Sequence, residues 1–278
     1  MKVERSGQPF GANVTEIDLA GPLDPDLISA IRAAWQDHGV LAFPGQSMDD
    51  AALERFTLAM GGFGEDPYFD TLPGSDHVAA ILREAEEQTP LFAEAWHSDW
   101  SFLPDPPSGT CLLGIDIPPT GGDTLFADQR AAFAALPAEK QALCRSLTAI
   151  HSARAAYAPD GAYGEQDEGR SMAIRPDESA RATRSHPLVL THPETGEEAL
   201  FSCGGYIIGI EGMEGEAAFK LLVELLAWQT DDRFVYRHRW EAGTLVMWDN
   251  RRVLHRATGG YEGHRRELHR TTIAAWQG

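Results

Sequence analysis

The chain is poor in cysteine and in basic residues. It has three cysteines in 278 residues, Cys111, Cys144 and Cys203, and they form no Cys-x-x-Cys pair. Neither a thiolate zinc site nor a disulfide framework is therefore indicated, and a reducing cytoplasm is the expected compartment. Lysine and arginine number 23 against 42 aspartates and glutamates, which gives a formal net charge of −19. A surface of this sign repels phosphate backbones, so nucleic acid is not an expected partner.

Long apolar runs, repeats and nucleotide-binding loops are missing as well. No apolar stretch is long enough to span a bilayer, and no segment has the form of a signal peptide, so we expect no membrane partner. The chain has no phosphate-binding glycine loop, dinucleotide fingerprint or serine-hydrolase elbow. It also lacks internal repeats and linkers, and 43% of its residues are apolar, enough for a large core. We therefore expect residues 1–278 to form a single domain.

Hydrophobic patterning predicts helices at the N-terminal side and short strands beyond it. A strand pair comes first, then a helix capped by Asp24 and ended by Gly39, a buried strand over 40–43, and a helix that begins in a capping box at Ser47 and ends at Gly61. The expected later strands are 77–82, 110–117, 124–126, 188–191, 199–201, 244–248 and 269–274. Regular short strands with turn residues between them are typical of a sandwich or barrel, so the predicted class is mainly β with flanking helices (α+β).

Two helices and one long loop interrupt these strands. The helices are expected over 131–149 and 214–228. The core-facing side chains predicted for the second helix are Phe219, Leu222, Val223, Leu226 and Ala227. The loop over 157–175 is rich in glycine and acidic residues, and segments of this kind are either lids or disordered spans. As a lid, it would carry Tyr157 or Tyr163 over a site.

The motif Trp96-His97-Ser98-Asp99 is the first sign of chemistry. On an extended strand, side chains two residues apart point to the same face, so His97 and Asp99 can converge on one point. A second imidazole, His255, follows an apolar strand and a turn at Asp249-Asn250. Two histidines and one carboxylate on one face of an ion form the facial triad of non-haem Fe(II) oxygenases, which leaves positions open for substrate and dioxygen.

The spacing alone is weak, because His-x-acid occurs twice in this chain. The other copy, His192-Pro193-Glu194, lies at a turn between two apolar runs and is interpreted as the solvated tip of a hairpin. His97 differs because aromatic residues flank it on both sides. The same ligand types also suit zinc, so a zinc hydrolase or a cupin-like metal-binding protein without oxygenase activity remains an alternative. A non-catalytic interaction protein is a third.

Two arginines near the C-terminus provide a further signal. In a strand, Arg266, Leu268 and Arg270 share one face. Guanidinium groups that face a barrel interior require anionic partners, either carboxylate side chains or ligands. Four residues separate the two backbones by roughly 13 Å, which suits two different anions on either side of a metal. Pairing of one or both arginines with surface carboxylates is the alternative.

Taken in order, these segments resemble the Fe(II)/2-oxoglutarate-dependent dioxygenases of the taurine dioxygenase branch, which includes alkylsulfatases and aryloxyalkanoate-degrading enzymes. The similarity runs from about residue 8 to the C-terminus. The segments that carry it are Trp96 to Asp99 with Phe102 and Pro106-Pro107, Gly121 to Thr124, Trp248 to Arg251 with His255, and Arg265-Arg266 with His269-Arg270.

The resemblance implies a double-stranded β-helix, a cupin-like jelly roll, with helices packed outside. His97, Asp99 and His255 look like the ligands of Fe(II). Arg266 and Thr124 match the residues that bind the distal carboxylate of the co-substrate 2-oxoglutarate. The enzyme would consume O2, release succinate and CO2, and hydroxylate a small acidic substrate that Arg270 holds. A homodimer or homotetramer is the expected assembly. A zinc hydrolase has no evident need for Arg266 and Thr124.

One position departs from the family pattern. Members that cleave taurine carry a histidine just before a proline in the loop after the second helix, and it helps to hold the sulfonate. Here Asp66 precedes Pro67. Because a carboxylate repels a sulfonate, taurine itself is a doubtful substrate. Asp66 is expected either to face a cationic or hydroxyl group on another substrate, or to point to solvent.

Overall fold

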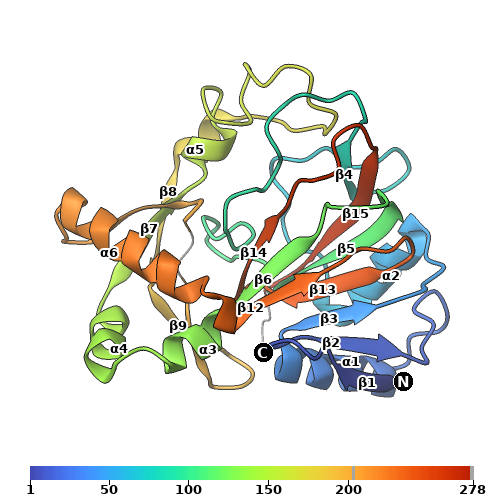
Figure 1. Cartoon of the computed structure of the whole chain (residues 1–278), viewed down its shortest axis with the longest axis horizontal. Coiled ribbons are helices and arrows are strands. Elements are labelled where there is room, and N and C mark those ends of the chain that lie inside the picture. The colour runs from blue at the N-terminus through green and yellow to red at the C-terminus, as the bar shows by residue number, and fades with distance from the viewer. Residues whose placement is uncertain (202–203, 276–278) are drawn as a thin grey trace.

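Strands form most of the regular structure, and helices pack around them (Figure 1). The computed structural model describes residues 1–201 and 204–275. The first elements are β1 (Lys2–Arg5), β2 (Ala12–Thr15), α1 (Pro25–His38), β3 (Val40–Phe43) and α2 (Asp50–Gly61). The predicted class, mainly β with flanking helices, is confirmed.

Two sheets build the centre of the molecule. The larger sheet joins the N-terminal strands to β4 (Ala79–Arg83), β5 (Gly109–Asp116), β13 (Leu245–Asp249) and β15 (Arg266–Ile273), in the order β1-β2-β3-β13-β5-β15-β4. The smaller sheet contains β6 (Thr124–Asp128), β12 (Val235–His238) and β14 (Val253–Ala257), in the order β12-β6-β14. Together they form the expected double-stranded β-helix, and each strand predicted from the sequence is present with its ends moved by a few residues.

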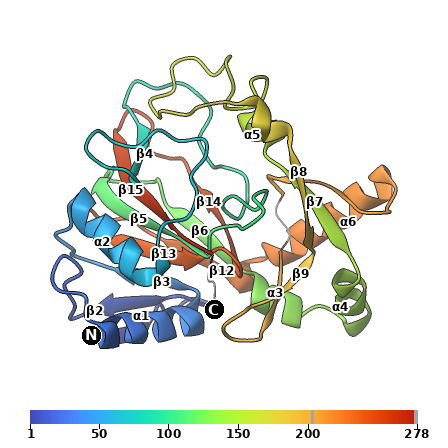
Figure 2. The ribbon, with the colours of Figure 1, turned by 180° about the vertical axis from the view of Figure 1, so that it is seen from behind.

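Alternation along β13 shows how the larger sheet is covered on both faces. Leu245 and Met247 pack with α1 and α2, which lie against one face of the sheet in Figure 2. Val246 and Trp248 point the other way and pack against the smaller sheet. Apolar side chains therefore fill one end of the space between the two sheets. A cavity lies at the other end.

The caps of the first two helices follow local sequence chemistry. The Asp24 carboxylate accepts a hydrogen bond from the Leu27 amide, and Gly39 ends α1 with a positive φ, as predicted. The cap of α2 is Asp49, whose carboxylate accepts from the Ala52 amide. The predicted capping box at Ser47 is therefore wrong by two residues, because Asp49 is itself a good cap.

A third group of elements lies beside the two sheets, at the left of Figure 1. The strands β7 (Thr148–Ser152), β8 (Thr183–Pro187) and β11 (Ile207–Ile210) form a sheet in the order β11-β7-β8, and β9 (Val189–Thr191) pairs with β10 (Glu198–Leu200) in the predicted hairpin. The helix predicted over 131–149 is instead two helices, α3 (Gln129–Ala134) and α4 (Ala138–Arg145), because Pro137 at the start of α4 cannot continue α3. Short elements complete the chain: α5 (Arg154–Tyr157) and the 3-10 turns Glu178–Arg181 and Asp232–Phe234.

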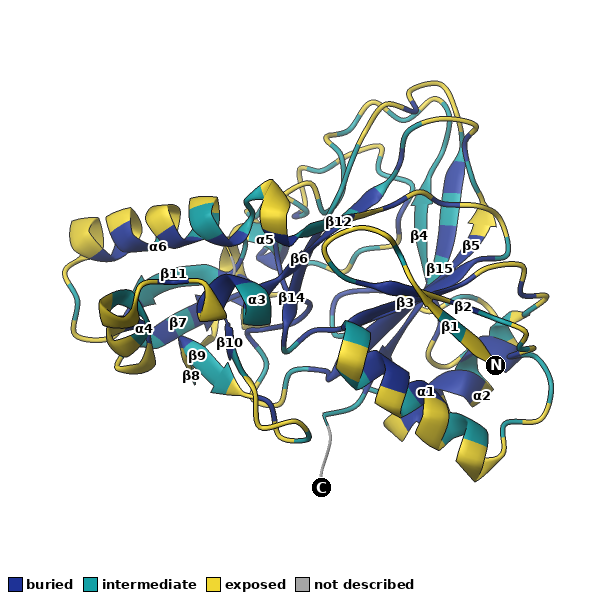
Figure 3. Cartoon of the chain, turned by 60° about the horizontal axis from the view of Figure 1, so that its bottom comes forward, coloured by how far each residue is buried: buried dark blue, intermediate teal, exposed yellow. Residues whose placement is uncertain are grey.

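Helix α6 (Gly215–Gln229) is present as predicted, but it buries a different face. Phe219 and Val223 are 70% and 50% exposed, whereas Ala218, Leu221 and Leu225 are buried. Figure 3 shows the exposed outer side of this helix. The predicted core face was wrong by about one residue at Phe219, Val223 and Ala227, whereas Leu222 and Leu226 do pack against the core. Apolar residues occupy both faces of this helix, so spacing cannot choose between them. None of the helices in residues 1–201 and 204–275 combines the length and apolarity needed to cross a membrane.

Candidate iron and co-substrate site

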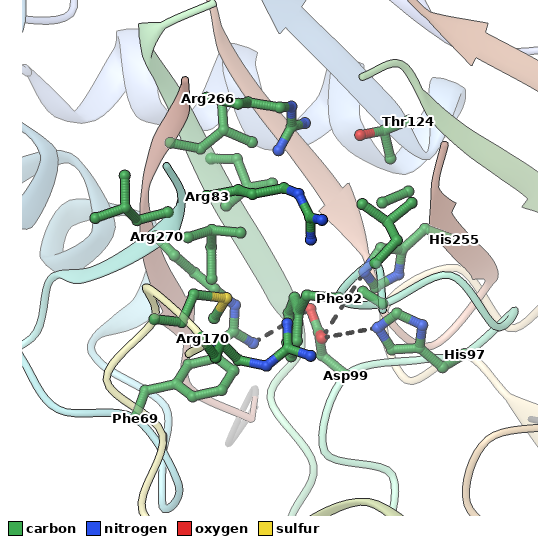
Figure 4. Close-up of a pocket in the computed structure, with 18 of the residues that line it drawn as sticks. Phe69, Arg83, Phe92, His97, Asp99, Thr124, Arg170, His255, Arg266 and Arg270 are labelled. Atoms are coloured by element: carbon green, nitrogen blue, oxygen red, sulfur yellow. Dashed lines mark ion pairs between the residues drawn. The ribbon is translucent and has the colours of Figure 1, made fainter. Parts of the chain in front are cut away.

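The candidate site lies in a cavity between the two sheets, with a volume of about 750 Å³ including its open mouth (Figure 4). His97 and Asp99 come from the segment before β5, His255 from β14, and Arg266 and Arg270 from β15. Each of these side chains is at least nine-tenths buried. The structure therefore brings together residues that lie up to 173 positions apart in the chain.

The two candidate histidine ligands are neighbours through their backbones. The His97 amide donates to the His255 carbonyl at 3.0 Å, and the His255 amide donates back to the His97 carbonyl at 2.8 Å. His97 stands in an isolated bridge rather than in the regular strand that we expected. The bridge still aligns the two rings, whose centroids are 4.2 Å apart.

Asp99 completes the candidate triad. Its Oδ1 lies 3.7 Å from His97 Nε2 and 3.8 Å from His255 Nε2. One donor atom from each of the three residues lies within 4.8 Å of the others. Two nitrogens and one oxygen that meet in this way fit a divalent transition metal.

The protonation states also suit a metal. His97 Nδ1 lies 2.8 Å from the Ala95 carbonyl, to which it can donate, and this directs the lone pair of Nε2 at Asp99. Burial lowers the pKa of both histidines, that of His255 to about 3, so the rings are neutral at physiological pH. Burial alone would raise the pKa of Asp99, but the positive charge of Arg270 and the two imidazoles hold it well below its usual range.

A chain of buried hydrogen bonds fixes the Asp99 carboxylate. The Thr110 hydroxyl donates to Asp99 Oδ2 at 2.6 Å, Asn250 Nδ2 donates to that hydroxyl at 3.0 Å, and Trp248 Nε1 donates to Asn250 Oδ1 at 2.9 Å. Sequence reasoning missed Thr110 and Asn250 as site residues. Asn250 lies within the Trp-Asp-Asn-Arg segment, but only the fold places it beside a residue 140 positions earlier.

Arg266 is a buried guanidinium with no carboxylate partner among the described residues. Its Nη2 donates to the Gly122 carbonyl at 3.0 Å, its Nε has no hydrogen-bond partner, and burial lowers its pKa. Gly122 has a φ of 68°, and a Cβ there would lie 2.9 Å from Arg266 Nε, so glycine allows this close approach. Thr124 lines the same cavity, and its hydroxyl accepts from Trp240 Nε1 at 3.0 Å. An anion that entered the cavity could accept hydrogen bonds from Arg266 and Thr124, and no carboxylate of the described chain competes for Arg266.

Arg270, in contrast, is paired. Its Nη1 contacts the Asp66 carboxylate, and its Nη2 lies 3.3 Å from Asp99 Oδ2. We had expected Asp66 to face either a group on the substrate or solvent. It instead points to Arg270 of its own chain. Although burial raises the pKa of Asp66, the guanidinium charge favours its ionised form.

Comparison with known proteins agrees with this geometry. A family model described as taurine catabolism dioxygenase TauD, TfdA family, matches residues 2–272. The chain belongs to this family. It is 36% identical to an alpha-ketoglutarate-dependent 2,4-dichlorophenoxyacetate dioxygenase of Cupriavidus pinatubonensis, over 95% of this chain and 94% of that protein. It is 32% identical to an alpha-ketoglutarate-dependent sulfate ester dioxygenase of Pseudomonas putida, over 95% and 86%.

Solved structures give the same result. AAD-2 in complex with Mn(II) and N-oxalylglycine superposes with a TM-score of 0.81 at 28% identity, over 99% of this chain and 98% of that one. A taurine dioxygenase from Burkholderia xenovorans has the same TM-score and identity. The chain is thus an oxidoreductase of the 2-oxoglutarate-dependent dioxygenase type, which uses Fe(II), 2-oxoglutarate (alpha-ketoglutarate) and O2. The alternatives of a zinc hydrolase and of a protein without oxygenase activity are not supported.

The second His-x-acid motif of the dioxygenase lies away from this site, but it is not a solvated tip. His192 is only 5% exposed, and its Nε2 lies 2.9 Å from Asp249 Oδ2. Glu194 binds Arg32 at 2.7 Å and Arg251 at 3.0 Å. The predicted exposure of His192 was wrong, because the β9–β10 hairpin folds back onto the end of β13 and these ion pairs bury its turn.

The loop over 157–175 covers the cavity. Tyr157, Arg170 and Met172 line the cavity itself, and Tyr163 lines a smaller hollow beside His97. The Tyr163 hydroxyl accepts a hydrogen bond from the Ala93 amide at 3.1 Å. The segment thus occupies the place that a lid would have. Of the cysteines, Cys111 and Cys144 are free thiols, and Cys203 lies outside the described residues.

Proposed function

We propose that this dioxygenase hydroxylates a small acidic organic substrate, such as a sulfonate, sulfate ester or aryloxyalkanoate, and releases succinate and CO2. The names of the relatives support this class of substrate. The observation that carries the proposal is the buried guanidinium of Arg266, which has no acidic partner in the described chain and shares one cavity with the His97, Asp99 and His255 triad.

His97 and His255 would hold Fe(II) through their Nε2 atoms, and Asp99 would hold it through Oδ1. When bound, iron, 2-oxoglutarate and O2 together supply the oxidising chemistry that turns a C–H bond into C–OH. The residues contribute preorganisation: neutral rings, a carboxylate fixed by Thr110, and buried side chains around both. Trp248 packs against the His255 ring at a centroid distance of 4.6 Å and limits its rotation.

Arg266 and Thr124 would bind the distal carboxylate of 2-oxoglutarate. Arg266 lies between the rings of Trp240 and Tyr261, at 6.0 and 5.8 Å, which restrains its guanidinium plane. A planar fork that is already oriented loses little entropy when it binds a carboxylate with two parallel hydrogen bonds. The Thr124 hydroxyl accepts from Trp240, so its own proton remains for an anion.

Arg270 is placed to contact the primary substrate. Arg270 reaches the cavity next to Asp99, and Asp66 supports it from behind. The walls around them are apolar and aromatic, including Phe69, Phe92 and Met172. Such walls suit the organic body of a substrate, and polar groups then orient it.

Three further properties belong to the proposal. We expect the 278 residues to act as one domain, in the cytoplasm, where the thiols of Cys111 and Cys144 stay reduced. We also expect a homodimer or homotetramer. Exposed Phe219 and Val223 on α6 are candidates for its interface, because exposed apolar side chains often mark protein contacts. Light scattering on wild type and Phe219→Glu tests this: a monomeric wild type contradicts it.

A succinate-release assay with Fe(II), 2-oxoglutarate and O2 tests the proposed activity. At least one acid among alkanesulfonates, alkyl sulfates and phenoxyalkanoates should raise succinate release at least tenfold over the substrate-free rate. Arg266→Ala should raise the KM for 2-oxoglutarate, whereas Arg270→Ala should leave that KM within threefold of wild type. Equal effects of the two substitutions would refute the division of roles, and no stimulation by any acid would refute the substrate class.

A further inference from the structure

We propose that Arg83 and Arg170 form a second anion subsite of the cavity, and that it is this pair, rather than Arg270, that binds the acidic group of the primary substrate. The inference rests on the proposed function and specifies where its substrate lies. Figure 4 shows both side chains at the cavity, with Arg270, Asp99 and the histidines nearby.

Arg270 has little capacity left for a substrate acid. Asp66 occupies its Nη1, and Asp99 lies 3.3 Å from its Nη2. The two faces of its guanidinium are covered by the rings of Phe69 and Trp100, at 5.2 and 5.0 Å. A carboxylate or sulfate binds arginine best through two adjacent N–H groups. Nη2 has no hydrogen-bond partner in the described chain, but the carboxylates of Asp66 and Asp99 already compensate the charge of this guanidinium. Arg270 can therefore offer a substrate a hydrogen bond from Nη2, which suits an uncharged oxygen.

Arg83 lies on the cavity side of β4. In the ladder it is directly opposite Arg266, and Ala79 is opposite Arg270. Facing residues of antiparallel strands share one side of the sheet, so Arg83 points to the same cavity as Arg266. Four residues along β4 place its backbone roughly 13 Å from the level of Arg270. Its guanidinium donates to Glu87 Oε1 at 3.2 Å and to the carbonyls of Glu87 and Thr89.

Arg170 approaches the same point from the loop that covers the cavity. Its side chain is 5% exposed. Asp167 binds its outer edge through Nε and Nη2, and Nη2 also donates to the Pro90 carbonyl at 3.1 Å. Its Nη1 faces Glu87 Oε1 at 3.8 Å, which is too long for a hydrogen bond. This N–H group is the donor that an incoming anion would find.

Glu87 holds the two arginines together only loosely. Its Oε1 serves both guanidiniums, at 3.2 and 3.8 Å, and accepts from the Thr89 hydroxyl as well, while Oε2 accepts from the Ser171 amide at 2.9 Å. Strong charge-assisted contacts are about 2.7–2.9 Å long. An oxyanion between Arg83 and Arg170 would therefore gain shorter bonds than Glu87 makes now.

If the arginine pair binds the acidic group, the substrate must carry that group at one end and the carbon that is oxidised at the other. The carbon would lie beside His97, Asp99 and His255, and an apolar body would pass along Phe92 and Met172 to the arginine pair. We thus assign the substrate to the class of acids whose charged group is separated from the oxidised position by an apolar spacer.

Binding measurements without O2 test the subsite. The Fe(II)- and 2-oxoglutarate-loaded protein is titrated with two acids, 2,4-dichlorophenoxyacetate and hexyl sulfate, and with their uncharged counterparts, 2-(2,4-dichlorophenoxy)ethanol and hexan-1-ol. Calorimetry gives each Kd. Arg83→Gln and Arg170→Gln should each weaken the tighter acid about 10- to 100-fold, since a hydrogen bond to a charged group is lost, and should leave the alcohols within threefold.

Two further variants separate binding from folding. Glu87→Gln should tighten the acid several-fold, because it removes a competing carboxylate; a purely structural role for Glu87 predicts the opposite. Arg175→Gln, on the same loop but outside this cavity, is the matched control and should change nothing. Arg270→Gln should keep the preference for acid over alcohol.

The outcomes distinguish this inference from the proposed function. If 2-oxoglutarate does not bind to the iron-loaded protein, the proposed function fails. If 2-oxoglutarate binds but neither acid does, or if only Arg270→Gln abolishes the preference for the acid while Arg83→Gln and Arg170→Gln stay within twofold of wild type, the subsite is refuted.

Discussion

Replacing Arg266 by methionine should make the ligand-free protein more stable while it weakens 2-oxoglutarate binding. Arg266 is 5% exposed and has no carboxylate partner in the described chain. The effective cost of burying a charge is several kcal/mol, and only one hydrogen bond, to Gly122, and two ring contacts offset it here. A methionine of similar length fills the space without that cost. We expect the free energy of unfolding to rise by about 1 kcal/mol.

The same substitution removes the partner of the co-substrate. Two charge-assisted hydrogen bonds are lost, so the Kd for 2-oxoglutarate should rise about 100-fold or more. The assays are urea unfolding of the ligand-free protein and anaerobic titration of the metal-loaded protein. A rise in the free energy of unfolding together with a fall in 2-oxoglutarate affinity would show that Arg266 serves binding rather than folding.

Arg252→Met is the matched control for this prediction. Arg252 is 3% exposed, but its Nη2 lies 3.3 Å from Asp128 Oδ2. Breaking this buried pair leaves Asp128 with Arg130, 3.7 Å away, as its remaining cationic neighbour, and should destabilise the protein by about 3 kcal/mol. If Arg266→Met destabilises the protein by a similar amount, or leaves 2-oxoglutarate affinity unchanged, Arg266 is a structural residue and our reasoning is wrong.

Three other predictions test different parts of the account. Thr110→Val removes the donor to Asp99 and should weaken Mn(II) binding about 10- to 100-fold in a metal-competition assay, whereas Thr57→Val, equally buried but remote, should not. Burial lowers the pKa of His151 to about 3, so the stability that its neutral form contributes is complete above pH 6.5 and is lost as the pH falls towards 3. Urea unfolding of His151→Gln should therefore lose about 2 kcal/mol less between pH 7 and pH 5 than wild type, and an equal loss would contradict this. On α6, at protein concentrations where the chain is monomeric, Phe219→Ser should change the free energy of unfolding by no more than about 0.5 kcal/mol. Leu225→Ala should lower it by about 2–4 kcal/mol; the reverse order would show that the originally predicted face is the buried one.

The sequence was sufficient to predict the fold class, and it brought His97, Asp99, His255 and Arg266 forward as one constellation. These residue types limit the possible functions, because few sites in a barrel need neutral imidazoles, a carboxylate and an inward-facing guanidinium together. The structure brings them into one cavity. Their assignment to iron and 2-oxoglutarate remains a proposal that the experiments above address.

Partners that depend on the fold could not be predicted in this way. Asp66 and Arg270 are separated by 204 positions, and no local pattern links them. The same holds for Thr110 with Asp99, and for Asn250 with Thr110. In each case a polar group is satisfied by tertiary contact, and the sequence reveals only that the group needs a partner.

Local errors had local causes. On α6, apolar residues surround the helix, so periodicity left the buried face ambiguous. The turn at His192 has the composition of an exposed hairpin, yet its polar contacts with Asp249 of β13 and Arg32 of α1 bury it. Pro137 separates α3 from α4, a break that an apolar pattern running across it concealed.

Anaerobic titration with Fe(II) and then 2-oxoglutarate is the most direct test of the central claim. The account predicts a metal-to-ligand charge-transfer band in the wild type, its loss in His97→Ala, and saturation at a much higher 2-oxoglutarate concentration in Arg266→Met. The absence of the band in the folded wild type, or its survival in His97→Ala, would contradict the assignment of this cavity to iron and its co-substrate.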